Sequence, residues 1–326
     1  MLGDHPRDIT AAEQFDWTLR QVVAAQEAGL TYAFIGQHYF WQGETRWLQP
    51  VPTLARLAAE VDSDFRFATQ IMVSPLYDPV MLAEDLATLD IVTGGRLDVG
   101  LGLGYVAEEF AAVGAIFEER VLRFEEGVEL IRRLWTEDHV DFRGQFYEVS
   151  GHTHIRPFQT PHPPIWIGAQ SKKAIRRAAR LGDAWPITPQ VSVEELPDLI
   201  EIYAAERRRL GKPVTSQPLR REIVIGRNRE DAISKAVEMA KPWYLAMGHS
   251  NGVDRDEVLA SMPEVVARSF VIGDGAECAE QLRGVERLVD VDPVVTRGNW
   301  PGMGLAEMLA YVESLGRELV PALAGS

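Results

Sequence analysis

The sequence predicts a single α/β domain folded as a (β/α)8 TIM barrel. Helical and strand patterns alternate along the chain with short connections, which is typical of parallel βα units rather than of a β-sandwich. The length of 326 residues accommodates one barrel of about 250 residues together with insertions. No shift in composition marks a boundary, so we assign residues 1–326 to one domain.

The expected elements follow one another in a regular order. Apolar runs predict strands at residues 31–35, 65–73, 96–100, 165–168, 184–187, 221–226 and 288–294. Apolar residues at helical spacing predict helices at 15–29, 51–61, 79–92, near 108, 118–135, 172–181, 193–210, 230–246 and 305–315. Strand and helix therefore alternate through both halves of the chain.

Two insertions and a short start depart from this order. Residues 140–149 alternate around Gly144, which predicts a β-hairpin within an insertion at about 138–162. A second insertion at about 248–269 is polar and then weakly helical. Only residues 1–3 precede the polar loop 4–8, so we expect the first barrel strand to be short or missing. That would expose strand edges that barrel closure normally removes.

The composition limits the classes of partner. Subtracting 48 acidic from 33 basic residues gives a formal charge of −15, which disfavours nucleic acid and anionic membrane surfaces. The single cysteine, Cys278, has no partner for an internal disulfide and is expected to pack in a helix. No apolar run approaches the roughly 20 residues of a membrane span, and the start lacks a signal-peptide pattern. We therefore expect a cytoplasmic protein.

The segment 94–105 is the most informative part of the chain. A short apolar strand leads into three alternate glycines and then a helix start, which suits a phosphate or a flat cofactor that approaches the backbone closely. A dinucleotide fingerprint requires G-x-G-x-x-G after the first strand of a βαβ unit. This run reads G-x-G-x-G and lies near residue 100, so a nicotinamide site is disfavoured.

With its flanking motifs, this segment resembles the bacterial luciferase-like flavin monooxygenase superfamily. The motifs that carry the resemblance are residues 69–75, 78–79, 83–85, 89–90, 94–105, 117–120, 123, 134–135, 163–168 and 181–185. They cover residues 25–190 most firmly. Relatives usually begin with an apolar strand several residues longer, so the resemblance implies that Met1 is an internal methionine.

The resemblance implies a flavin-dependent oxidoreductase. The expected activity is a monooxygenase that uses reduced FMN, supplied by a separate flavin reductase, and O2 on a small organic substrate, and that acts as a homodimer. An alternative within the superfamily is hydride transfer with a 5-deazaflavin coenzyme. In the sugar-phosphate dehydrogenases of that branch an acid follows the glycine loop, whereas Tyr105 stands there in this chain. A third possibility is a flavin-binding protein without enzymatic activity.

The resemblance also implies which residues form the site. His38 follows the second strand and matches the histidine that faces flavin and substrate, although a lone loop histidine in contact with solvent would give the same pattern. Gln70-Ile71 matches a non-proline cis peptide that forms a bulge behind the flavin ring. An ordinary trans strand is the alternative there.

The flavin phosphate is expected at two turns. The turn of Gly168, Ala169, Gln170 and Ser171 opens a helix and offers unpaired N–H groups, and the resemblance adds the loop at Gly104 and Tyr105. The alternative for the first turn is a plain helix cap.

Other prominent residues carry weaker expectations. Trp41, Trp47 and Trp185 are expected either in the core or along an aromatic substrate pocket. The acidic pairs at 108–109, 118–119 and 125–126 are interpreted as helix-start and surface charge. The histidines at 152, 154 and 162 lie in a proline-rich loop without supporting carboxylates, so no metal site is predicted.

Overall fold

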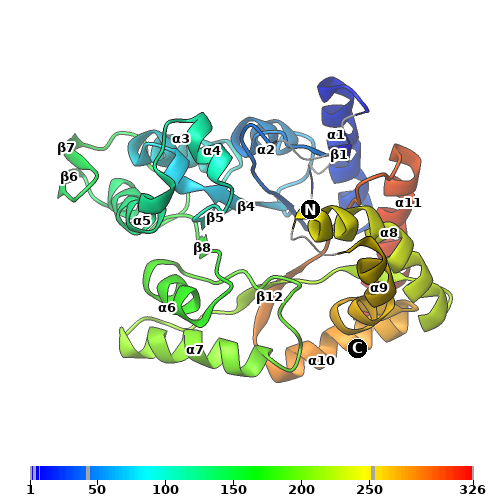
Figure 1. Cartoon of the computed structure of the whole chain (residues 1–326). Helices are drawn as coiled ribbons and strands as arrows, with labels where there is room; N and C mark the ends of the chain where they lie inside the picture. The colour runs from blue at the N-terminus through cyan, green and yellow to red at the C-terminus, as the bar shows by residue number, and fades with distance from the viewer. Residues whose placement is uncertain (1, 3–4, 7, 42–44, 251–253, 325–326) are drawn as a thin grey trace.

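The computed structural model describes residues 2, 5–6, 8–41, 45–250 and 254–324. Helices surround a set of central parallel strands (Figure 1), so the predicted TIM barrel is confirmed. No helix of the described residues is long and apolar enough to cross a membrane.

One side of the barrel is a continuous parallel sheet. It consists, in spatial order, of β2 (Tyr32–Ile35), β4 (Arg66–Val73), β5 (Leu97–Gly102) and β8 (Ile165–Ile167). The helices α2 (Pro50–Leu57), α3 (Pro79–Val92) and α5 (Arg120–Thr136) connect these strands and share a large apolar core with them. This side matches the predicted strands and helices to within a few residues.

The other side of the barrel is joined more sparsely. Residues 184–187 make single bridges, from Ala184 to Trp166 and from Ile187 to Leu219, and form no regular strand. Beyond them β9 (Gln217–Arg220) pairs in parallel with β12 (Val291–Val295). The helices α6 (Lys172–Leu181) and α7 (Leu196–Arg209) cover this region from outside.

The predicted strand at 221–226 is a partial error. The barrel strand is β9, which ends at Arg220, and β10 (Ile223–Ile225) leaves the barrel to pair with β11 (Val271–Gly273). The sequence analysis missed β9 because Gln217, Pro218 and Arg220 interrupt its apolar pattern. Four helices pack around this small second sheet: α8 (Arg229–Ser250), α9 (Arg255–Ser269), α10 (Gly275–Leu288) and α11 (Leu305–Ser314).

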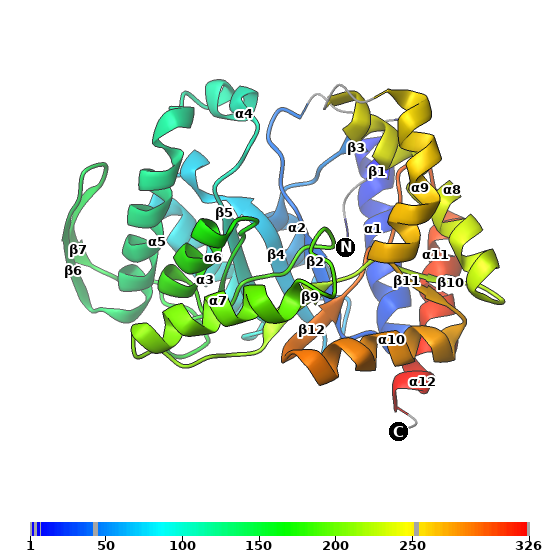
Figure 2. The same cartoon turned by 60° about the horizontal axis from the view of Figure 1, so that its bottom comes forward.

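The first insertion forms the predicted hairpin. Strands β6 (His139–Arg143) and β7 (Glu148–His152) pair antiparallel, and the hairpin stands beside α5 at the edge of the molecule (Figure 2). The Glu126 carboxylate of α5 accepts hydrogen bonds from three successive backbone N–H groups, of residues 145, 146 and 147, at 2.9, 2.9 and 2.8 Å. In the second insertion, α9 begins at the same end of the barrel as α4 (Ala107–Ala112) in Figure 2.

Between β2 and β12 the barrel has a seam. Leu2 makes a single parallel bridge to Ile35, its N–H donating to the Phe34 carbonyl at 2.8 Å, and its side chain is buried. The next described residues leave the barrel, since β1 (His5–Pro6) pairs antiparallel with β3 (Thr45–Arg46). The short or missing first strand stays a prediction, because Met1, Gly3 and Asp4 lie outside the described residues.

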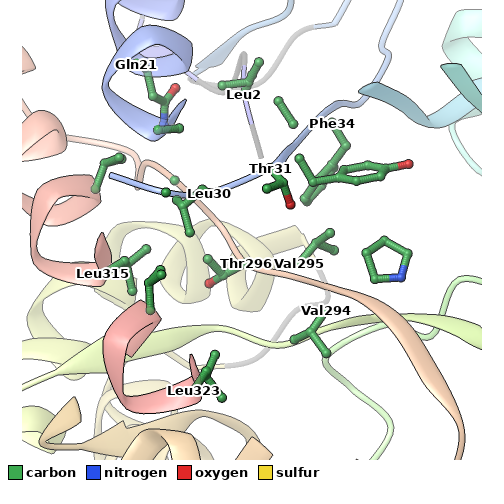
Figure 3. A pocket seen from close by; sticks show the side chains of 18 of the residues that line it. Leu2, Gln21, Leu30, Thr31, Phe34, Val294, Val295, Thr296, Leu315 and Leu323 are labelled. Carbon is green, nitrogen blue, oxygen red and sulfur yellow. The ribbon is translucent and has the colours of Figure 1, made fainter. Parts of the chain in front are cut away.

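A cavity occupies the seam. Its volume is about 510 Å³, and it is lined by residues 30–34 on the β2 side, 292–296 on the β12 side and Leu315 and Leu323 from the C-terminal helices (Figure 3). Among the described residues, β2 and β12 share no strand pairing. This is where the first strand of a closed barrel would run.

A polar cluster lines a cavity of about 560 Å³ at the N-terminal end of the barrel interior. Asp98 is buried, accepts a hydrogen bond from the Tyr32 hydroxyl, and forms an ion pair with Arg66 at 3.0 Å. Burial raises the pKa of the Asp98 carboxyl above its usual value, although Arg66 opposes the shift. The Tyr32 ring also stacks with Trp166. This cluster lies at the N-terminal ends of the strands, opposite to the loops that follow their C-terminal ends.

Candidate functional site

Four sequence-predicted segments meet at the C-terminal edge of the continuous sheet. His38 follows β2, the Gln70-Ile71 bulge lies in β4, the glycine loop follows β5, and Gly168 follows β8. Because these strands are parallel neighbours, their C-terminal ends lie at one rim. In TIM barrels this rim carries the active site.

His38 is held in a pocket of aromatic rings. Its ring centroid is 4.3 Å from Trp41, 4.9 Å from Trp47 and 6.0 Å from Tyr105. Its Nδ1 lies 2.5 Å from the Glu109 carboxylate, and the side chain is only 12% exposed. His38 is therefore not a loop histidine in contact with solvent alone.

The backbone of the His38 loop is fixed by two glutamines. The Gln49 side-chain amide donates to the His38 carbonyl at 3.0 Å, and its Oε1 accepts from the Gln37 side chain at 3.0 Å. The Gln37 Oε1 in turn accepts from the Val73 N–H at 3.0 Å, which ties the loop to β4. The position of the imidazole is thus set by contacts along its loop and not only at its ring.

Glu109 corrects the sequence interpretation. The pair Glu108-Glu109 was expected to provide helix-start and surface charge, but the Glu109 side chain is 2% exposed and contacts His38. Its helix, α4, directly follows the glycine loop, and this placement at the rim was the available signal. Sequence spacing alone did not reveal the contact because 71 residues separate the two side chains.

Two glycines, Gly102 and Gly168, lie below the Ile71 side chain at the rim between β4, β5 and β8, and we call them the glycine floor. The Gln70-Ile71 peptide bond is cis, as the resemblance implied, and the β4–β5 register shifts between Thr69 and Met72. The Ile71 side chain lies over Gly102 and Gly168: a Cβ at either glycine would come within 2.7 or 2.3 Å of it. Only glycine lets the backbone lie this close to Ile71.

Polar atoms without partners surround this floor. Gln70 Oε1, Ser74 Oγ and Trp47 Nε1 are buried and have no hydrogen-bond partner among the residues that the structure describes. Buried polar atoms are normally paired, so such atoms at a rim indicate groups that can receive a ligand. A flat ring with donors and acceptors on its edge, such as a flavin, fits this combination of glycine floor and unpaired polar atoms.

The turn at 168–171 is only partly free to bind phosphate. The Gly168 N–H donates to the Leu101 carbonyl at 3.0 Å, and the Ala169 carbonyl accepts from Trp185 Nε1 at 2.8 Å. Gln170 and Ser171 are exposed, and Ser171 Oγ caps α6 by accepting from the Ala174 N–H at 3.3 Å. The anion-binding capacity therefore lies in the Ser171 hydroxyl and the first amides of α6, which have no acceptor within the helix.

The remaining predicted residues lie partly at the rim and partly in the core. Gly104 has a φ of +75°, and a Cβ there would meet Val73 and Phe110, so glycine is required. Tyr105 lies beside His38 and is 74% exposed. Trp185 is fully buried in the core, whereas the rings of Trp41 and Trp47 contact the ring of His38.

Comparison with known proteins identifies relatives of this chain among flavin-dependent and F420-dependent enzymes. Residues 1–291 match a family model described as luciferase-like monooxygenase. The F420-dependent glucose-6-phosphate dehydrogenase of Amycolatopsis mediterranei is 29% identical over 294 residues, 84% of this chain and 86% of that protein. The FMNH2-dependent dimethylsulfone monooxygenase of Pseudomonas putida is 30% identical over 204 residues, 61% of this chain and 55% of that protein.

Solved structures share the fold over nearly the whole chain. The monooxygenase RslO1 from Streptomyces bottropensis superposes with a TM-score of 0.84 at 25% identity, covering 98% of each chain. An F420-dependent secondary alcohol dehydrogenase superposes with a TM-score of 0.77 at 16% identity, covering 99% of each chain, and supports the fold alone.

Proposed function

Because the chain belongs to the luciferase-like monooxygenase family, whose members are flavin- or F420-dependent oxidoreductases, we propose that it is a monooxygenase that binds reduced FMN. The observation that carries the proposal is the glycine floor at Gly102 and Gly168, bordered by the unpaired Gln70 Oε1 and Ser74 Oγ. When bound, reduced FMN supplies the electrons that activate O2 for transfer to a small organic substrate.

In this proposal each part of the rim has its own task. Ile71 and the glycine floor would hold the isoalloxazine ring, and Ser171 with the start of α6 would hold the phosphate. His38 holds or moves a proton beside the ring, while Trp41 and Trp47 keep water away from it. The aromatic surroundings favour an apolar or aromatic substrate.

Reduced FMN would come from a separate flavin reductase. A relative, the trigonelline monooxygenase of Acinetobacter baylyi, is described as the oxygenase component of its system, and it is 26% identical over 89% of this chain. This chain also lacks the dinucleotide fingerprint that a built-in nicotinamide site would use. We further propose a homodimer, which light scattering can test.

Ser171→Asp tests the phosphate site. Aspartate keeps the helix cap but adds a negative charge, so the affinity for reduced FMN should fall about tenfold, which corresponds to about 1.4 kcal/mol. The affinity for riboflavin, which has no phosphate, should stay unchanged, and Ser171→Ala is the uncharged control. Equal losses for FMN and riboflavin would remove this turn from the phosphate site.

His38→Ala tests the catalytic role. The variant should fold and bind reduced FMN as the wild type does, but turnover of an oxygenated substrate should fall by about 10²–10⁴. Wild-type turnover would make His38 a structural residue.

The alternative is hydride transfer with the deazaflavin F420. It is favoured by the glucose-6-phosphate dehydrogenase of Amycolatopsis mediterranei, which matches this chain over most of its length. Anaerobic titration with reduced FMN and with F420 separates the two functions. Tighter binding of F420, together with loss of oxygen-dependent turnover, would replace the monooxygenase proposal with this one.

A further inference from the structure

The buried contact between His38 and Glu109 has a consequence for the chemistry of the imidazole. Glu109 Oε1 lies 2.5 Å from His38 Nδ1, and the carboxylate is 2% exposed. Within the described part of the chain, His38 is the one basic side chain within ion-pair distance of Glu109. A carboxylate only accepts hydrogen bonds and is costly to bury without a donor, so with Glu109 as a carboxylate the contact places a proton on Nδ1.

The remaining contacts of His38 involve its ring faces and its backbone carbonyl and not its second nitrogen. Trp41 and Trp47 flank the imidazole, and Gln49 holds the His38 carbonyl. With Nδ1 committed to Glu109, among the described residues no second hydrogen bond reaches the ring. Nε2 is then the nitrogen that can exchange a proton with a bound molecule, since a histidine bonded through one nitrogen reacts through the other.

We propose that Glu109 is a positioning residue that keeps the proton on Nδ1 of His38, so that Nε2 is the atom that takes or gives a proton at the rim. The assignment of a proton-transfer task to His38 rests on the proposed function. The location of the Nδ1 proton does not, because it is a property of the protein without cofactor.

The direct test is ¹⁵N NMR of the histidine side chains in the cofactor-free protein at mildly alkaline pH. The chain has seven histidines, and the His38 signals are assigned by their loss in His38→Ala. The wild type should show His38 protonated at Nδ1. In Glu109→Ala the ring should shift towards the Nε2-protonated form that imidazole favours in water, and Glu109→Asp should restore part of the Nδ1 form.

Glu108→Ala is the matched control. Glu108 is the exposed neighbour on the same helix, so its removal changes the net charge equally without touching His38. The His38 signals should stay as in the wild type. A wild-type ring protonated at Nε2, or a ring unchanged in Glu109→Ala with its fold intact by circular dichroism, would overturn the proposal.

A second measurement connects the proton to the reaction. Glu109→Ala should keep reduced-FMN affinity within about twofold and lose at least tenfold in turnover, because loss of a carboxylate that orients a catalytic histidine impairs proton transfer and not binding. If FMN fails to bind the wild type but the NMR result holds, the proposed function fails and the positioning of the Nδ1 proton by Glu109 stands. If FMN binds and turnover in Glu109→Ala equals that of the wild type, Glu109 has no positioning role.

Discussion

The two sides of the barrel differ in how their strands are joined. From β2 to β8 the sheet is continuous, whereas from β8 to β12 it passes through single bridges at Ala184 and Ile187 and then reaches the open seam. All four rim segments of the candidate site belong to the continuous side. The site is therefore built where strand positions are most strongly fixed, although β2, which leads to His38, is also one border of the seam.

The largest expected effect is the difference in stability loss between two leucine-to-alanine substitutions, one on each side of the barrel. Leu97 in β5 is fully buried, so Leu97→Ala should lower the free energy of unfolding by about 2–5 kcal/mol. Leu30 is half-buried and lines the seam cavity, so Leu30→Ala should cost less than half as much. Urea denaturation measures both. Equal losses would mean that the seam is as well packed as the closed side.

An alanine-to-leucine substitution should change stability in opposite directions on the two sides of the barrel. Ala87 in α3 is fully buried on the continuous side. Ala87→Leu should therefore overpack the core and lower the free energy of unfolding by about 1–3 kcal/mol. Ala25 in α1 (Ala11–Glu27) lines the seam cavity, so Ala25→Leu should fill empty space and raise the melting temperature. A lower melting temperature for Ala25→Leu would show that the cavity cannot receive a larger side chain.

An added strand should close the seam. Four alternating apolar residues joined directly before Met1 would continue the parallel pairing that Leu2 begins with Ile35. The buried side chains should outweigh the cost of ordering them by about 1 kcal/mol, which raises the melting temperature by roughly 2–4 °C. A Gly-Ser extension of equal length is the control. The same melting temperature for both extensions would contradict a strand-shaped seam.

The smallest expected effect on stability concerns Cys278, which lies near the seam. The residue is buried in α10 against Leu315, which also lines the seam cavity. Burial raises the pKa of its thiol from 9.0 to about 12. The unfolded chain then loses the proton first, so between pH 9 and 12 stability should fall as pH rises. Cys278→Ala should flatten part of this slope in denaturation curves, and an unchanged slope would contradict the pKa shift.

The contrast between the two sides also explains what the sequence could predict. The ranges of α3 and α6 were predicted to the residue because both combine an N-cap with a regular apolar pattern. Strand β9 was missed because Gln217, Pro218 and Arg220 interrupt its apolar pattern, and it is a strand through its pairing with β12. Strand order predicted that the four rim segments lie together, but the burial of Glu109 depends on a contact across 71 residues that no local pattern encodes.

The close packing at the glycine floor predicts that residues 71, 102 and 168 constrain one another's substitutions. A methyl group at Gly102 or Gly168 would collide with the same Ile71 side chain, from β5 on one side and from β8 on the other. Each alanine is therefore tolerable only in a background where residue 71 has already become smaller. Alanine at position 168 would meet Ile71 Cδ1, so relatives with that alanine should carry valine or a smaller residue at position 71. Alanine at position 102 would meet Ile71 Cγ2, which valine keeps, so relatives with that alanine should carry alanine or glycine at position 71. The three sites are therefore expected to covary although they lie in three different strand segments.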